Sequence, residues 1–249
     1  MPDLYRAAVK QSLSDLLEQA EALVDARLSE IATKGGPGSG RYPKGSGEGE
    51  DSDEEIFGES TYDGGVSGVK HDSKWKKKNG LVSISEIGDK EIDRKVDEVC
   101  KETGYDKNKI YMTKTLSPVL GEYKTGDDYI VLSPLATGDK LKGVLSHEVT
   151  HAQTADTIKE YFHQSRSGKS DTPIFKALSA NVAECLDEDN GRFTEYIAKF
   201  SGNLQNDRSV RNKFYVISEG LAERSRMRVE GGKYPEAWDR LYEKVKGLK

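Results

Sequence analysis

The sequence predicts an α+β fold in which short strands come first and helices follow. Segments that alternate between apolar and polar residues lie between residues 80 and 133, whereas the pattern after Gly138 is helical up to the last residues. Strands followed by helices is the order of an α+β domain, here with a small, mostly antiparallel sheet. With 33% charged and 35% hydrophobic residues, the 249-residue chain can form one folded domain with polar extensions.

The first segment, residues 1–33, is predicted to be a long amphipathic helix. Its apolar residues recur at spacings of three and four: Leu13, Leu17, Ala20, Val24, Leu28 and Ile31. A helix of this kind needs a partner for its apolar stripe. Docking on the distant domain, self-association and attachment to another protein are all open.

Residues 34–68 are predicted to be a flexible linker, because glycine, serine and a run of acidic residues offer no packing surface. Residues 38–47, with the sequence GSGRYPKGSG, resemble a segment of proteins encoded in the structural gene clusters of tailed bacteriophages. The resemblance implies a chain connected with virion assembly or delivery, in which a phage structural protein is a partner of the N-terminal helix. A generic linker is the alternative.

The third segment, residues 69–249, is predicted to be the folded domain. Its expected strands are 81–87, 110–112, 119–123 and 129–132, with a hairpin turn at 125–128. Its expected helices are 90–103, 139–157, 173–187, 191–203, 209–229 and 236–247.

Composition argues against several classes of function. The one tight basic cluster, Lys74 and 76–78, is typical of a solvated loop, so we expect no nucleic-acid partner. No stretch approaches ~18 apolar residues and no signal peptide is recognisable, so we expect no membrane association and a location in the host cytoplasm or in a virion. Cys100 and Cys185 lack metal-type spacing and are expected to be reduced thiols.

Chemistry is indicated by His147, Glu148 and His151, which form an HExxH pattern. Histidines four residues apart lie on one face of a helix and can bind one ion, while the glutamate lies about one hundred degrees around the helix, beside that ion. This arrangement suits two Zn²⁺ ligands and a general base for hydrolysis.

The motif also lies on the apolar stripe of its predicted helix, in the same arc as Leu141, Val144, Leu145, Ala152 and Ala155. Two imidazoles and a carboxylate facing a core are costly without partners, and a bound dication satisfies all three. We therefore expect Zn²⁺ as the cofactor.

A third protein ligand is required. Thr154 and Thr157 stand where the metzincin pattern needs glycine and histidine, so that class is excluded; His163 is one candidate, although it precedes a stretch that is typical of a loop. Glu219 in the segment SEGLAE is the other.

With HExxH, that segment resembles the glutamate zincins, the thermolysin-like peptidases. The resemblance spans residues 108–229 and implies that Glu219 is the third ligand and that Glu223 orients one histidine. The alternative for Glu219 is an ordinary surface glutamate, since it points away from the apolar stripe of its helix. The resemblance also implies that an extended substrate pairs with Tyr129–Ser133.

A donor for the developing oxyanion completes such a site. Tyr215 and Arg226 lie on the predicted Glu219 helix, one turn before and two turns after that residue, and each is a candidate. We therefore predict a zinc metalloendopeptidase that hydrolyses peptide bonds of a protein or peptide substrate. The alternative is a non-catalytic virion protein that keeps the same fold for structure or for binding a partner.

Overall fold

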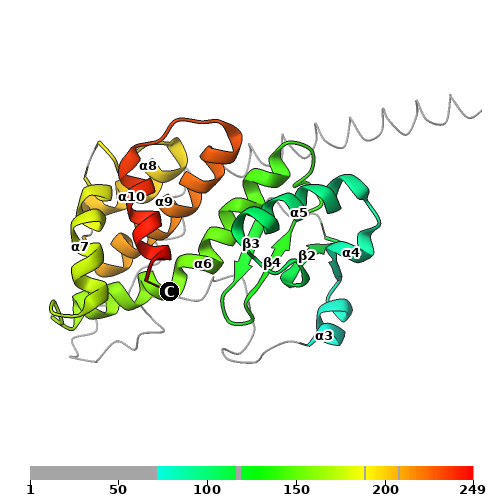
Figure 1. The fold of residues 1–249 in the computed structure, drawn as a ribbon, viewed down its shortest axis with the longest axis horizontal. Helices are drawn as coiled ribbons and strands as arrows, with labels where there is room; N and C mark the ends of the chain where they lie inside the picture. Colours follow the sequence, from blue (N-terminus) through cyan, green and yellow to red (C-terminus); the bar gives the residue numbers. More distant parts are fainter. Residues whose placement is uncertain (1–71, 116–118, 188, 207, 249) are drawn as a thin grey trace, which may run out of the picture. The chain divides into compact units, whose positions relative to one another are not determined.

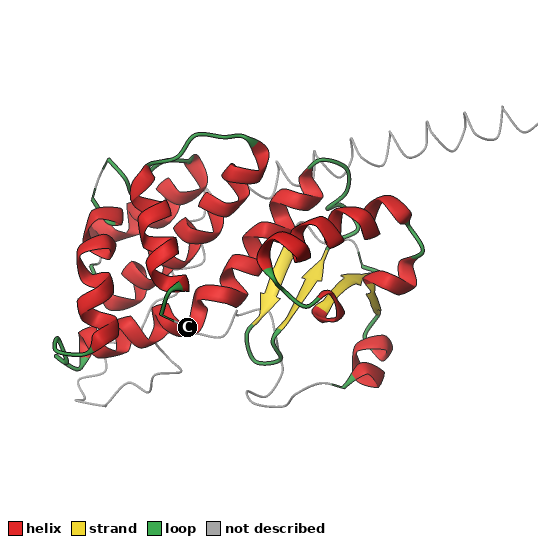
Figure 2. Cartoon of the chain, viewed as in Figure 1, coloured by secondary structure: helices red, strands yellow, loops and turns green. Residues whose placement is uncertain are grey.

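The computed structural model describes residues 72–115, 119–187, 189–206 and 208–248. The predicted N-terminal helix, 1–33, and the predicted linker, 34–68, lie outside these residues. In the part that is described, a four-stranded sheet with its accompanying helices is followed by a helical half, as Figures 1 and 2 show. The predicted α+β fold class is confirmed.

The sheet has the strand order β1-β2-β4-β3. Its strands are β1 (Leu81–Ser83), β2 (Ile110–Thr113), β3 (Gly121–Lys124) and β4 (Tyr129–Leu132). One parallel pair, β2 with β4, lies between two antiparallel pairs, so the sheet is mixed. The predicted hairpin turn at 125–128 joins β3 to β4, and its last residue, Asp128, adopts a positive φ of 53°.

The predicted strand 81–87 is wrong in its second half. After three residues of β1 the chain forms the short helix α4 (Ile84–Ile87), which ends at Gly88 with a φ of 76°. Ile84 is 1% exposed and packs in the sheet core. Burial of this side chain, followed by a turn that needs a left-handed residue, overrides the alternating pattern.

The lysine cluster is exposed at Lys74, Lys77 and Lys78, as predicted, but it is not a loop. It forms the helix α3 (Ser73–Lys78), whose N-cap Asp72 accepts a hydrogen bond from the Trp75 backbone N–H at 2.8 Å. The Lys76 ammonium lies 4.1 Å from the ring centre of Tyr129 and 4.7 Å from that of Tyr111. Partial burial lowers the pKa of Lys76, against the opposing charges of two nearby aspartates.

The helix α5 (Lys90–Thr103) covers one face of the sheet, and its bounds match the prediction. Asp89 caps it by accepting hydrogen bonds from two backbone N–H groups, and Gly104 ends it with a φ of 75°. A 3₁₀ turn, η1 (Lys107–Lys109), leads into β2. Together with the first half of α6, these elements enclose the sheet core: Ile84, Val96, Val99, Ile110, Met112, Ile130, Leu132, Ala136, Leu141, Val144, Leu145 and Val149.

The long helix α6 (Lys140–Arg166) runs from the sheet core into a second core made of helices. It extends nine residues past its predicted end, 157, because Ile158, Tyr161 and Phe162 continue the apolar stripe and the first glycine comes at 168. The other helices are α7 (Pro173–Cys185), α8 (Glu195–Asn206), α9 (Val210–Glu230) and α10 (Glu236–Lys246), each within a few residues of its prediction.

The helical core brings side chains of α6, α7, α9 and α10 together around Trp238, which is fully buried. Gly220 of α9 makes this packing possible, since a Cβ at that position would lie 2.1 Å from a ring atom of Trp238. Among the described residues, no helix is both long and apolar enough to cross a membrane.

Candidate metal centre

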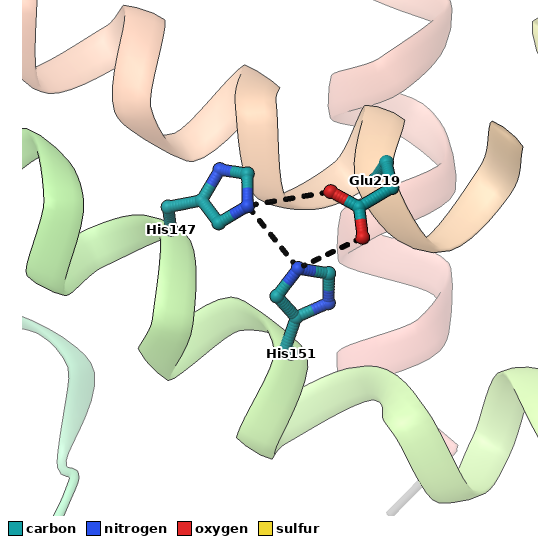
Figure 3. A group of neighbouring side chains, drawn as sticks. All are labelled: His147, His151 and Glu219. Carbon is teal, nitrogen blue, oxygen red and sulfur yellow. Dashed lines mark hydrogen bonds and ion pairs between the residues drawn. The ribbon is translucent and has the colours of Figure 1, made fainter. Parts of the chain in front are cut away.

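Two packed helices bring three of the predicted ligands together. Figure 3 shows His147 and His151 projecting from α6 toward Glu219 on α9. The Nε2 atoms of the two histidines are 3.2 Å apart. The carboxylate of Glu219 reaches both imidazoles, with Oε2 3.5 Å from Nε2 of His147 and Oε1 3.6 Å from Nε2 of His151.

The surface alternative for Glu219 is excluded by the packing of α9. Phe214, Ile217 and Leu221 form the buried stripe that was predicted, and they face the helical core. The opposite side of α9 faces α6 instead of solvent, and the Glu219 side chain is only 19% exposed. The polar face of α9, which is typical of a solvent-exposed surface, here lies in the interface between α9 and α6.

The three side chains are close enough together that they could hold a metal ion. Two imidazole nitrogens and one carboxylate oxygen lie within 4.8 Å of one another, so one ion can contact all three. Ligand atoms at about 2.0–2.1 Å from a tetrahedral ion are about 3.3 Å apart. The separation of the two imidazole nitrogens, 3.2 Å, is close to this value, and the separations of 3.5 and 3.6 Å join these nitrogens to the two different oxygens of the Glu219 carboxylate. Three protein ligands would leave a fourth position for water or substrate.

The outer nitrogens of the two imidazoles meet acceptors from α9. Nδ1 of His151 is 3.1 Å from the Ser218 hydroxyl oxygen. Nδ1 of His147 is 3.9 Å from the Glu223 carboxylate, beyond hydrogen-bond length but within the range of an ion pair. If both acceptors hold a proton on Nδ1, both Nε2 lone pairs point at Glu219 and at each other, an arrangement that a cation stabilises.

Glu223 itself is 1% exposed and is held by Arg226, whose guanidinium donates two hydrogen bonds to it at 2.8 and 2.6 Å. Arg226 also donates to Glu230 at 3.2 Å. The guanidinium proposed as an oxyanion donor is therefore engaged by two carboxylates. Its place in the structure is that of a support for Glu223, and through Glu223 for His147.

The charges of the cluster are mutually dependent. Burial acts to raise the pKa of Glu219, but the neighbouring imidazoles of His151 and His147 hold it well below its ordinary value. Burial acts in the opposite sense on His151, yet the Glu219 carboxylate raises the pKa of that imidazole overall. Glu219 is therefore ionised and attracts positive charge to this position.

Glu148 lies beside the cluster in a buried environment, and its residue is 8% exposed. Burial raises the pKa of Glu148, with the two imidazoles acting against this shift and Glu219 adding to it. A hydrogen bond from the Tyr123 backbone also reaches its carboxylate, and since a carboxylate only accepts, the N–H of this β3 residue faces the site. A raised pKa is what a general base needs near neutral pH.

Gly121 brings β3 onto the motif helix. A Cβ at this position would lie 2.7 Å from Cγ1 of Val144 and 2.9 Å from Cγ of Glu148, closer than side chains pack. Only glycine allows the strand to approach so closely. This residue was not predicted to belong to the site, although a glycine inside a predicted strand, here 119–123, is a signal for close backbone approach.

The strand expected to bind substrate needs a correction. Tyr129–Leu132, β4, has hydrogen-bonded neighbours on both sides, β2 and β3, so neither of its edges can accept a peptide. Among the described strands, β3 is the edge strand next to α6. In the sheet β4 lies between β2 and β3, although it follows β3 in the chain. The chain order therefore led to the prediction of β4, and not β3, as the strand that pairs with substrate.

Tyr196 of α8 is a further site residue that the sequence analysis missed. Its hydroxyl donates a hydrogen bond to Oε2 of Glu219 at 2.6 Å, and its ring lies edge-on to His147 with 6.0 Å between ring centres. Burial and the adjacent carboxylate raise the pKa of Tyr196, so the hydroxyl stays a donor. No local pattern marks this residue, which reaches the site only because α8 packs on α9.

A cleft of about 250 Å³ lies over the cluster. Its lining includes Gly121, Glu122, Tyr123, Thr125, His147, Glu148, His151, Ala155, Lys159, Tyr196, Phe214, Tyr215, Ser218 and Glu219. Tyr215 is thus in the cleft, but the hydroxyl that bonds the cluster is that of Tyr196. His163 lies on α6 twelve residues beyond His151, about 18 Å along the axis, too far to be a ligand.

Comparisons with protein-family models, curated proteins and solved structures find no match for this chain.

Proposed function

We propose that this chain is a zinc-dependent endopeptidase of the glutamate-zincin type. The observation that carries the proposal is the convergence of His147, His151 and Glu219 on one point, with the buried carboxylate of Glu148 beside it. Imidazole and carboxylate ligands with near-tetrahedral spacing favour zinc over calcium or magnesium, which prefer oxygen ligands and higher coordination.

The edge of β3 supports a peptide as the substrate. Its backbone faces the cleft at Tyr123, and an extended peptide can add to the sheet there through main-chain hydrogen bonds. Such binding places a peptide bond between the strand and the motif helix. Because most of the hydrogen bonds come from backbone groups, it suits a protein or peptide substrate of varied sequence.

The chemical roles follow from position. Bound zinc would supply a Lewis acid that polarises the water and the carbonyl of the cleaved bond. Glu148 accepts the proton of the attacking water and later returns it to the leaving nitrogen. Ser218 orients the imidazole of His151 through a hydrogen bond, and the charge of Glu223, 3.9 Å from Nδ1 of His147, favours a proton on that nitrogen. Tyr215 lines the same cleft and offers a hydroxyl donor for the oxyanion, whereas the hydroxyl of Tyr196 donates to Glu219.

The association with phage particles is a separate part of the proposal. It is supported by residues 38–47, which resemble a segment from phage structural gene clusters, and by the predicted helix before them. A tethered peptidase of this kind would act on structural proteins during assembly or on a host protein after delivery.

The test is metal analysis followed by proteolysis. The purified full chain should contain about one zinc per molecule and should cleave an unfolded protein in the absence of chelator but not in its presence. Glu148→Gln should keep the zinc and lose at least about 100-fold in cleavage rate, since general-base catalysis contributes about 10²–10⁴-fold. Glu219→Ala should lose zinc.

Glu160→Gln is the matched control, because Glu160 is an exposed glutamate on the same helix. It should cleave at the wild-type rate. Full activity of Glu148→Gln would contradict the assignment of the base, and a metal-free chain recovered from zinc-containing solution would contradict the metal site. A wild-type chain that binds zinc and cleaves nothing would favour the non-catalytic alternative.

A further inference from the structure

The cleft contains one lysine or arginine among its described lining residues, Lys159. It lies on α6 about two turns after His151, lines the same cleft, and is half-buried. No described carboxylate forms an ion pair with its ammonium group. The nearest acidic residue along the helix on the side of the motif, Asp156, is exposed and does not line the cleft.

The acidic residues of the cleft all have other partners. Glu219 faces the two imidazoles, and Glu148 accepts a hydrogen bond from β3 beside them. Glu122 forms an ion pair with Lys124 at 2.7 Å. If the cluster holds a dication, its charge balances the carboxylates around it. Among the described residues that line the cleft, Lys159 is then the charged side chain that has no partner of opposite charge. A partly desolvated cation attracts an anion more strongly than one in bulk water.

The position of Lys159 defines which part of a bound peptide it meets. Eight residues of α-helix separate it from His151, a rise of about 12 Å. An extended peptide advances about 3.3 Å per residue, and helical side chains tilt toward the N-terminus. The ammonium therefore faces a substrate side chain about two to four residues from the cleaved bond.

The direction of β3 suggests which side of the bond this is. Gly121 lies against Val144 and Glu148, whereas Tyr123, farther along the strand, feels the charge of Asp156, farther along α6. The strand and the helix thus run in the same sense, as Figure 1 also shows. A peptide added antiparallel to β3, the more stable pairing, has its amino-terminal part toward Lys159.

We propose that Lys159 selects substrates with an aspartate or glutamate on the amino-terminal side of the cleaved bond, about two to four residues away. This inference rests on the proposed function, because it takes the occupant of the cleft to be a peptide. It assigns a substrate class, acidic peptides, to a cleft whose other contacts are mainly backbone and aromatic.

The first test is cleavage of a complex peptide mixture, made by digesting denatured cellular protein, with identification of the products by mass spectrometry. The zinc-loaded full chain should show acidic residues enriched by about 5- to 10-fold at the stated positions. Lys159→Glu should replace this preference with one for lysine and arginine, and Lys159→Met should abolish it.

Lys169→Glu is the matched control, since Lys169 is exposed, lies outside the cleft and changes the net charge equally. It should keep the acidic preference. Cleavage without acidic enrichment, or with the same enrichment in Lys159→Glu, overturns the inference and leaves the peptidase assignment intact.

The second test does not depend on catalysis. Binding of the Glu148→Gln protein to fluorescein-labelled random decapeptides rich in glutamate is compared, by anisotropy, with binding to a pool in which glutamine replaces glutamate. The glutamate pool should bind about 5- to 10-fold more tightly, and the difference should disappear in Glu148→Gln/Lys159→Met. Equal affinities for the two pools overturn the inference even if the wild-type chain cleaves nothing.

Discussion

The two cores of this domain differ in what they contribute to the site. The sheet core is mostly aliphatic and holds the first half of α6 through residues such as Leu145 and Val149. The helical core is rich in aromatic side chains and holds the second half through Ile158, Tyr161 and Phe162. His147 and His151 lie on α6, the helix that the two cores share, and Glu219 faces them from α9.

Each core supplies different residues to the site. The sheet side supplies the edge strand and the surroundings of Glu148, whereas the helical side supplies Glu219 and Tyr196. Between the two, buried threonine hydroxyls of α6 donate to its own carbonyl groups, Thr150 to Ser146 at 2.8 Å and Thr154 to Thr150 at 2.7 Å. No ligand depends on a loop, so the geometry follows from helix packing.

Alanine substitutions in each core, which should change stability most, test whether the two cores unfold as one cooperative unit. Leu145→Ala in the sheet core and Ile158→Ala in the helical core should each lower the free energy of unfolding by about 2–5 kcal/mol, because both side chains are fully buried. Since α6 belongs to both cores, each variant should unfold in a single transition.

The measurement is urea denaturation followed by far-UV circular dichroism and by fluorescence of Trp238 in a Trp75→Phe background, which removes the other tryptophan. Transitions that separate for the two probes would show that the cores unfold independently.

The reactivity of each cysteine thiol reports on the packing of one of the two cores. Partial burial raises the pKa of Cys100, beside the sheet core, to about 11, and burial raises the pKa of Cys185, in the helical core, to about 12, against an ordinary value of 9.0. A raised thiol pKa favours the unreactive protonated form. At pH 8 alkylation of Cys100 should be about 100-fold slower than in the urea-unfolded chain, and that of Cys185 slower still.

Iodoacetamide labelling followed by intact mass measures this, and the Cys100 rate should keep rising between pH 9 and 10, where an ordinary thiol levels off. Equal, fast labelling of both thiols at pH 8 would mean that the native packing around them is open. The structure has both cysteines free, as the sequence analysis expected.

Substitutions of two helical glycines by alanine distinguish the effect of tertiary packing on stability from the effect of helix propensity. Gly220→Ala should lower the free energy of unfolding by about 1–3 kcal/mol, because its Cβ would meet ring atoms of Trp238 at 2.1, 2.3 and 2.8 Å. Gly202→Ala, in the middle of α8, should stabilise by about 0.5–1 kcal/mol, since its added methyl group would meet no tertiary neighbour within 4 Å. Thermal unfolding of both variants gives the comparison, and effects of the same sign would disprove it.

The smallest expected effect concerns the helical contribution to the metal cluster. Tyr196→Phe removes the hydroxyl that donates to Glu219 at 2.6 Å but keeps the ring beside His147. Loss of such a partner should weaken zinc binding by about 10-fold. Competition with a chromogenic chelator measures the affinity, and Tyr215→Phe, in the same cleft, serves as the comparison. An unchanged affinity in Tyr196→Phe would show that the hydroxyl plays no part in holding the ligand.

Much of the fold was accessible from sequence because helices carry strong local signals. α5 was predicted with its observed bounds, since an N-cap aspartate and a terminal glycine enclose a clear apolar stripe. The prediction of a strand at 81–87 was wrong in its second half, because burial of Ile84 and the turn at Gly88 outweighed the alternation of apolar and polar residues. The end of α6 was placed too early because the stripe changes partner there, from the sheet core to the helical core.

The site divides in the same way. His147, Glu148 and His151 form a local motif, because residues four apart on a helix are neighbours whatever the rest of the chain does. Glu219 required a resemblance, and Tyr196, Ser218 and Gly121 were not predicted at all. Their contacts depend on which helix or strand lies against α6, and no periodicity within their own segments carries that information.

Local residue patterns were enough to predict the α+β order of elements, most helix limits and the motif that offers two imidazoles and a carboxylate from one helix face. Only the tertiary structure decided that Glu219 faces those imidazoles, that β3 instead of β4 is the free edge, and that Lys159 shares their cleft. The reason is physical: local patterns fix which face of an element is apolar, whereas the partner of its other face is chosen by packing across the whole domain.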